Sequence, residues 1–203
     1  MKISPRLELI LNHLIPGQPV WDICCDHGIL GRSAIRKNLF SEVHFVDQVD
    51  SIMQRLQSEI KKFRPEFILN TGDDYIYKDH DPQKLNLDLD QKENSLNLNP
   101  QIPVYLWLNS AHQTAQFWSG NIVIAGVGSQ LILEFLLEYV KNLNSKKSIQ
   151  ASTFFLCPQK DIKDIEEKLP LGLRIQQKIH FKEKHRDRIL YLVVSNLEDF
   201  KFL

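Results

Sequence analysis

The sequence has no long hydrophobic run and no feature of a secretion signal. The longest apolar runs, residues 122–125 and 189–194 among them, fall well short of the roughly 20 residues that a membrane-spanning helix needs. The N-terminus lacks a basic segment followed by an apolar stretch and a small-residue cleavage site. These absences predict a cytoplasmic protein that does not enter a membrane.

Charge of one sign and cysteine are also scarce. Lys plus Arg and Asp plus Glu both number 25, so the formal net charge is zero and any RNA site must be a local patch. The cysteines, Cys24, Cys25 and Cys157, form an odd set that includes an adjacent pair and has no metal-ligand spacing. Reduced, buried thiols are expected, with a reactive role as the alternative, and no metal site is expected.

A length of 203 residues favours one α/β domain over 1–203. Short runs rich in Val, Ile, Phe or Cys predict strands over 20–25, 42–47, 66–70, 121–126 and 152–157. Helix-compatible composition predicts helices over 5–14, 31–38, 50–63, 130–142 and 161–169. A further helix is predicted over 104–118, before the fourth of these strands. Such alternation predicts a parallel sheet that collects ligands at the carboxyl ends of its strands.

The end of the chain breaks the alternation. Residues 173–180 and 189–195 resemble two strands joined by a segment too short for a helical crossover, so they are expected to pair as an antiparallel hairpin. Five parallel strands and this hairpin predict a Rossmann-like class I methyltransferase fold, a mostly parallel seven-stranded sheet. The polar, repetitive segment 79–101 is predicted to be a surface insertion, with a half-buried strand as the alternative.

The segment Val20–Gly31 is predicted to run from a strand through a glycine-bearing turn into a helix. Gly28 allows close backbone approach, and the helix N-terminus offers N–H groups to a carboxylate such as that of S-adenosylmethionine. Asp22 and Asp26 are candidates to hold the ammonium group of that cofactor. Asp47 closes the second strand, where a carboxylate accepts hydrogen bonds from ribose hydroxyls, unless it serves only as a helix cap.

Two later glycine segments also follow predicted strands. Gly72 and Asp73 follow the third strand, where a carboxylate can receive the adenine amino group; an ordinary turn is the alternative. Ala125 and Gly126 end the fourth strand and are assigned to the cofactor. The small residues Gly126 and Gly128 would also leave room for a target base, and a tight strand-to-helix turn is the alternative. Both segments therefore belong to the predicted site or to turns beside it.

Four segments together resemble the tRNA (adenine-22) N1-methyltransferase family in order and spacing: Ser4–Leu30, Gly72-Asp73, Ile124–Ile132 and Leu156–Gln159. Cys24 stands where that family has glycine in the cofactor turn, and Gly31 stands where it has proline. The resemblance implies S-adenosylmethionine as cofactor, tRNA as partner, N1 of an adenine as methyl acceptor and no metal. It leaves the oligomeric state open.

Methylation of N1 creates a cationic base, so a nearby carboxylate can stabilise the charge or help remove the N6 proton. Asp26 is the best candidate, oriented by His27; a pair that only caps the turn is the alternative. Pro158 and Gln159 are predicted to form a pocket wall in which the Gln159 amide meets the base. Basic hairpin residues are predicted to hold RNA phosphates, or else to form a solvated turn: Lys178, Lys182, Lys184, Arg186 and Arg188.

Two other functions stay open at this stage. A methyltransferase acting on a small molecule or a protein is consistent with the zero net charge. A noncatalytic binding module is consistent with Cys24 in the turn, since the altered turn would no longer hold the cofactor. Binding of bulk tRNA separates the first alternative from the tRNA enzyme, and binding of S-adenosylhomocysteine separates the second.

Overall fold

The computed structural model describes residues 3–62, 68–70, 102–144 and 151–195. The predicted insertion at 79–101 lies outside the described residues, as do Gly72 and Asp73. The helices are α1 (Pro5–His13), α2 (Ile29–Lys37), α3 (Asp50–Lys61), α4 (Ala111–Thr114), the 3-10 helix η3 (Ala115–Phe117), α5 (Ser129–Asn144) and α6 (Asp164–Lys168). The strands are β1 (Val20–Ile23), β2 (Val43–Asp47), β3 (Ile68–Asn70), β4 (Val104–Leu108), β5 (Gly120–Ala125), β6 (Ser152–Cys157), β7 (Leu173–Glu183) and β8 (Arg186–Ser195).

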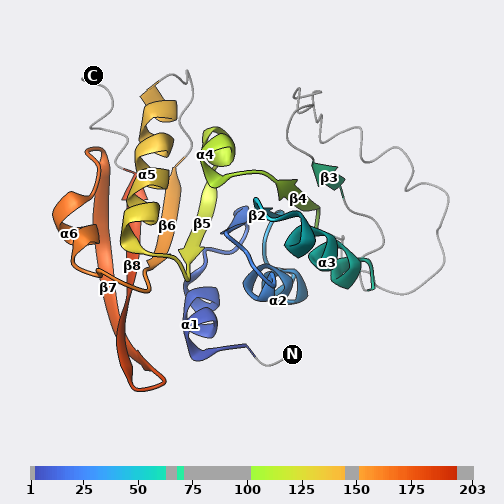
Figure 1. Ribbon diagram of the computed structural model, residues 1–203, viewed down its shortest axis with the longest axis horizontal. Coiled ribbons are helices and arrows are strands. Elements are labelled where there is room, and N and C mark those ends of the chain that lie inside the picture. The colour runs from blue at the N-terminus through green and yellow to red at the C-terminus, as the bar shows by residue number, and fades with distance from the viewer. Residues whose placement is uncertain (1–2, 63–67, 71–101, 145–150, 196–203) are drawn as a thin grey trace.

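The strands form one sheet in the order β3-β4-β2-β1-β5-β6-β8-β7, with β3 at one end and the β7–β8 hairpin at the other (Figure 1). Every pair from β3 to β6 is parallel, whereas β8 runs antiparallel to both β6 and β7. Lys184 and His185 make the hairpin turn with φ of 46° and 65°, as a two-residue hairpin turn of this hand requires. The mostly parallel α/β fold with a terminal antiparallel hairpin is confirmed.

The helix predicted over 104–118 is wrong for its first part, because β4 occupies Val104–Leu108. This additional strand lies between β2 and β3, so β3 takes the edge of the sheet. Val104 and Leu106 pack into one hydrophobic cluster while Tyr105 and Trp107 pack into the other. A strand that is buried on both faces reads as a continuous apolar run without alternation, which hides its type in the sequence.

Two hydrophobic clusters cover the two faces of the sheet. One joins the sheet to α4, η3, α5 and α6, and includes Trp21, Trp118 and Phe154. The other joins it to α1, α2 and α3, and includes Phe45 and Phe155. The carboxyl ends of the parallel strands are left between these two layers of helices, which is where this class of sheet binds ligands.

Hydrogen bonds define the start of α1 and attach the chain beyond its end to the sheet. Ser4 caps its N-terminus by accepting a hydrogen bond from the Leu7 backbone N–H at 3.3 Å, with Pro5 at the first helical position. Beyond its C-terminus, the buried Asn121 side chain on β5 accepts from the Ile15 N–H at 2.8 Å and donates to the Ile15 carbonyl at 3.0 Å. The Asn121 bonds tie the chain just after α1 to the central strand β5.

Two kinds of feature are absent from the described part of the chain. Within these ranges, no helix is both long and apolar enough to cross a membrane. Over the same residues, no three His, Cys, Asp or Glu side chains gather closely enough to hold a metal ion.

Candidate cofactor and substrate site

The predicted site residues converge because β1, β2 and β5 are adjacent and parallel. Ile23 pairs with Val46 on one side and with Ile124 on the other. The next residues of all three strands therefore leave the sheet at the same edge. This places the turn after β1 beside Asp47 and beside Ala125.

In the turn after β1, every second residue has a left-handed backbone conformation. Cys24, Asp26 and Gly28 have φ of 54°, 48° and 59°. For Cys24 and Asp26 this conformation costs roughly 1–2 kcal/mol each, because the Cβ approaches the following carbonyl oxygen. Glycine avoids that cost, and an ideal Cβ on Gly28 would also lie 2.5 Å from Leu56 Cδ1 on α3. Gly28 is thus required by both the turn and the packing of α3.

Asp22 joins the end of β1 to the first turn of α2 by a hydrogen bond. Its buried carboxylate accepts a hydrogen bond from the Gly31 N–H at 3.0 Å. Burial raises the pKa of Asp22 from 3.8 to about 7, opposed by the Gly31 bond and assisted by the nearby Asp47 carboxylate. Asp22 lines neither cavity of the site described below. Its contact with a cofactor ammonium group therefore stays a prediction.

The raised pKa of Asp22 predicts a pH-dependent stability. Its contribution is fully present below 3.8, where both the folded and the unfolded states are protonated, and is lost as the pH rises through about 7. Asp22→Asn keeps an oxygen for the Gly31 N–H and cannot ionise. We expect the variant to gain about 1–3 kcal/mol on the wild type between pH 5 and pH 8, measured by thermal unfolding. Asp50→Asn, at an exposed position, is the control and should show no such gain.

Asp47 joins the end of β2 to the turn. One carboxylate oxygen accepts from the Asp26 N–H at 3.3 Å and the other from the Val49 N–H at 3.0 Å. The Asp47 carbonyl accepts from the Asn109 N–H, just after β4, at 3.0 Å. A single residue thus ties together the ends of three strands. Asp47 lines neither of the two cavities described below, so its contact with a ribose stays a prediction.

A cavity of about 290 Å³ opens between the turn, α1 and the end of β5. It brings together six of the predicted site residues: Cys24, Asp26, His27, Ala125, Gly126 and Gln159. Gly126 has φ of 91°, and an ideal Cβ there would meet Gln159 Nε2 at 3.7 Å and Arg6 Nη2 at 4.0 Å. The glycine therefore keeps the floor of this cavity free of side chain, with two nitrogen donors above it.

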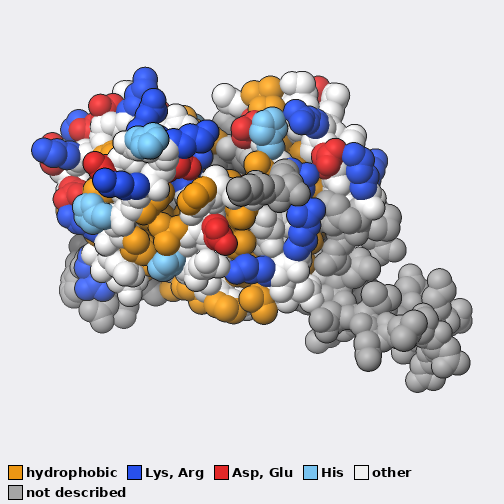
Figure 2. All heavy atoms as spheres, turned by 90° about the horizontal axis from the view of Figure 1, so that it is seen from below, with side chains coloured by type: hydrophobic (Ala, Val, Ile, Leu, Met, Phe, Trp, Pro, Cys, Tyr) orange, Lys and Arg blue, Asp and Glu red, His pale blue; other side chains and the backbone are white. Residues whose placement is uncertain are grey.

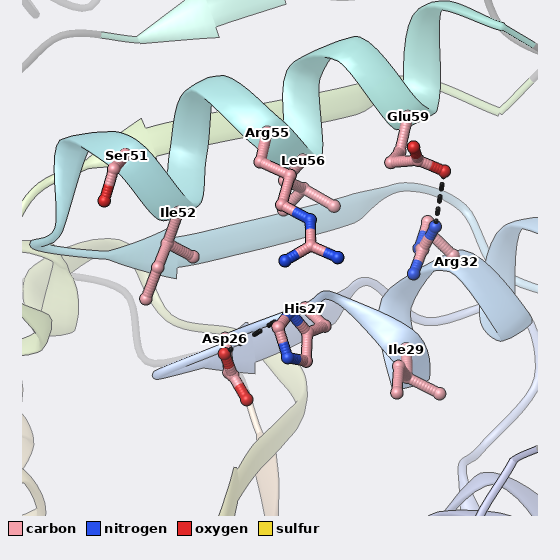
Figure 3. A pocket seen from close by; sticks show the side chains of 9 residues that line it. All are labelled: Asp26, His27, Ile29, Arg32, Ser51, Ile52, Arg55, Leu56 and Glu59. Atoms are coloured by element: carbon pink, nitrogen blue, oxygen red, sulfur yellow. Dashed lines mark hydrogen bonds and ion pairs between the residues drawn. The ribbon is translucent and has the colours of Figure 1, made fainter.

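Asp26 and His27 stand between this cavity and a second one. Their side chains are 67% and 51% exposed, and His27 Nδ1 lies 3.7 Å from Asp26 Oδ1. The second cavity, about 480 Å³, lies between α2 and α3, and Figure 3 shows Arg55 reaching across it toward His27. At its far end Arg32 bonds Glu59 at 3.4 Å. The pair is therefore accessible from both sides, as residues that meet a substrate must be.

The other predicted substrate residues differ in exposure and in whether they line a cavity. Gly128 faces open space, with no atom within 4 Å of an ideal Cβ. Pro158 is buried, whereas Gln159 is exposed and its N–H donates to the Val127 carbonyl at 2.8 Å. Lys184 and Arg186 line a recess beside the hairpin, but Lys182 does not. Because neighbouring strand residues point to opposite faces, Lys182 is on the other face from Glu183.

Two further residues shape this region and were not predicted as site residues, Ser4 and Arg6, whereas Arg188 is one of the predicted basic residues of the hairpin. Ser4 and Arg6 line both the 290 Å³ cavity and the hairpin recess. Arg188 donates to the Gln159 carbonyl at 2.8 Å. The pairing of Glu183 with Arg186 and of Phe181 with Arg188 puts all four on one hairpin face. The basic composition of the hairpin indicated Arg188, and no local pattern indicated Arg6.

The cysteines behave as expected for packed thiols. All three are free; Cys25 and Cys157 are buried and Cys24 is half-buried. Burial raises the pKa of Cys24 to about 12 and that of Cys157 to about 11, and raises the pKa of Cys25 well above its ordinary value. Thiolates are the reactive form, so these side chains are inert at neutral pH.

Known proteins resemble the chain in fold. A family model described as a methyltransferase domain matches residues 3–74, and no curated protein matches the sequence. Streptococcus pneumoniae Sp1610 in complex with S-adenosyl-L-methionine superposes with a TM-score of 0.62 and 18% identity, over 99% of this chain and 79% of that one. The chain has a class I methyltransferase fold.

Two further solved structures share this fold. TrmK of M. capricolum in complex with S-adenosyl-homocysteine gives a TM-score of 0.64 at 16% identity, over 97% of this chain and 70% of that one. TrmK of B. subtilis, the m1A22 tRNA methyltransferase, gives 0.64 at 16% identity, over 96% of this chain and 67% of that one. The methyltransferase fold is therefore shared over nearly the whole length of this chain.

Proposed function

We propose that the protein is an S-adenosylmethionine-dependent methyltransferase that modifies N1 of an adenine in tRNA. The observation that carries this proposal is the Asp47 carboxylate bonded to the turn after β1, beside a cavity floored by Gly126. Support also comes from the similar structures, whose proteins bind S-adenosyl-L-methionine or its product and include tRNA (m1A22) methyltransferases.

Groups at the strand ends can be assigned to the ribose, the carboxylate and the adenine of the cofactor. Asp47 would accept from the ribose hydroxyls, and the N-terminus of α2 would face the carboxylate. Because β4 and not β3 is the neighbour of β2, we place the adenine near Asn109 and not near Asp73.

When bound, the cofactor supplies an electrophilic methyl group on its sulfonium. The chain then has to align the adenine so that the N1 lone pair forms the new C–N bond as the S–C bond breaks. Gly126 leaves space for the base and Gln159 offers an amide to its edge. The Asp26 carboxylate stabilises the positive charge that develops on the base or accepts its N6 proton.

Methyl transfer to unmodified tRNA tests the proposal. The purified protein is incubated with radiolabelled S-adenosylmethionine and tRNA transcripts, and the digested product is analysed for 1-methyladenosine. We expect 1-methyladenosine from wild type, and roughly 100-fold less from Asp26→Asn if the carboxylate acts as a general base. Label in protein or small molecules, with none in tRNA, would contradict the tRNA assignment while leaving the methyltransferase activity.

A further inference from the structure

A basic recess lies next to the candidate base cavity, on the inner face of the β7–β8 hairpin. Four Lys or Arg side chains and one carboxylate line it, together with Ser4 and Gln159: Arg6, Lys184, Arg186, Arg188 and Glu183. Figure 2 views the molecule from below, with Lys and Arg side chains interspersed with Asp and Glu over this face. The recess is therefore a local positive patch on a chain whose formal net charge is zero.

Two arginines in the recess are held nearly buried around one acid. The Arg6 and Arg188 side chains are 19% and 10% exposed, and Glu183 lies between them at 14%. Its carboxylate oxygens are 3.9 Å from Arg6 Nε and 3.8 Å from Arg188 Nε. Charge-assisted hydrogen bonds are about 2.7–2.9 Å long, so Glu183 holds the two guanidinium groups together without saturating them.

Donors remain open on both arginines. Arg6 Nε and Arg188 Nε are buried, and neither has a hydrogen-bond partner among the residues that the structure describes. Both Nε atoms face Glu183 and are closed to solvent, so an entering anion would meet the outer Nη ends of the guanidinium groups. A guanidinium presents its donors as a rigid fork that matches the oxygens of a phosphate.

The recess and the base cavity are neighbours that share part of their walls. Ser4, Arg6 and Gln159 line both. Arg6 spans them, with Nη2 4.0 Å from an ideal Cβ on Gly126 and Nε facing Glu183. Arg188 bonds the Gln159 carbonyl at 2.8 Å, which ties the recess to the wall of the base cavity.

We propose that Arg6 and Arg188 bind a backbone phosphate of the RNA strand whose target adenine lies over Gly126. Glu183 is a positioning residue, because it keeps two like charges side by side and preorganises them for the anion. Lys184 and Arg186 at the recess extend the contact along the same strand. The inference rests on the proposed function and adds to it the residues that place the RNA backbone.

Binding of tRNA across a series of salt concentrations tests this inference. Arg6→Gln and Arg188→Gln are each expected to weaken binding about tenfold and to reduce the slope of log affinity against log salt by about one. Arg174→Gln is the matched control, an exposed arginine near the start of β7, at the opposite end of the hairpin from the turn. It should change neither quantity. Thermal unfolding is followed for each variant, and Arg6→Gln serves if Arg188→Gln does not fold.

The outcomes separate this inference from the proposed function. Binding by Arg6→Gln equal to that of Arg174→Gln would overturn the phosphate site, whether or not wild type forms 1-methyladenosine. Failure of wild type to bind tRNA at low salt would overturn it as well. Weakened tRNA binding by the two variants supports the site even if wild type transfers no methyl group, and in that case only the proposed catalysis fails.

Discussion

Asp47→Ala is expected to weaken binding of S-adenosylhomocysteine by about 100-fold or more. Two hydrogen bonds from ribose hydroxyls to an ionised carboxylate are worth about 1.5–3 kcal/mol each, and losing about 2.7 kcal/mol costs a factor of roughly 100 in affinity. The substitution also removes the acceptor of the Asp26 N–H, which would loosen the turn on which the cofactor rests. Isothermal titration calorimetry measures the loss.

The matched control for this variant is Asp50→Ala. Asp50 is also an aspartate in the segment after β2, but it is exposed at the start of α3 and its partner is the Gln54 side chain. We expect the affinity of Asp50→Ala to equal that of wild type. Equal affinities for all three proteins would remove Asp47 from the cofactor site.

Gly31→Ala is expected to lower the free energy of unfolding by about 2 kcal/mol and Tm by about 4–8 °C. An ideal Cβ on Gly31 lies 2.3 Å from Phe45 Cε1 and 2.6 Å from Phe45 Cζ. Phe45 is fully buried in the centre of the sheet, so its ring cannot move aside without disturbing its neighbours. Chemical denaturation and calorimetry both report the change.

A companion variant identifies the cause. Phe45→Leu removes the ring atoms that the methyl group added by Gly31→Ala would meet, so the double variant should be more stable than the sum of the two single effects implies. Gly128→Ala adds a methyl group where no atom lies within 4 Å and should change stability by less than about 0.5 kcal/mol. Strict additivity in the double variant would show that the Phe45 contact is not what excludes a side chain at Gly31.

Much of the fold follows from the sequence because its pattern is local. Each predicted strand is found in the sheet, and Ser4 and Pro5 start α1 as their chemistry dictates. The strand β4 was not predicted, because Val104–Leu108 is apolar on both faces. Such a run does not distinguish a strand from a buried helix. The expected adenine contact of Asp73 lies outside the described residues and stays a prediction.

The site was predictable only in the part that strand ends determine. Asp26, Gly126 and Gln159 each follow a parallel strand, so topology alone brings them to one cavity. Arg6 and Glu183 meet through tertiary packing of α1 against the hairpin, and no sequence spacing records that contact. The raised pKa of Asp22 likewise depends on how deeply the folded chain buries it.

Calorimetric titration of wild-type protein with S-adenosylhomocysteine tests the central claim most directly. We predict saturable binding at one site per chain, with an affinity that falls sharply in Asp47→Ala. Absence of binding by a folded wild-type protein would contradict that claim, and would leave a methyltransferase fold in which the turn of Cys24 and Asp26 no longer accepts the cofactor.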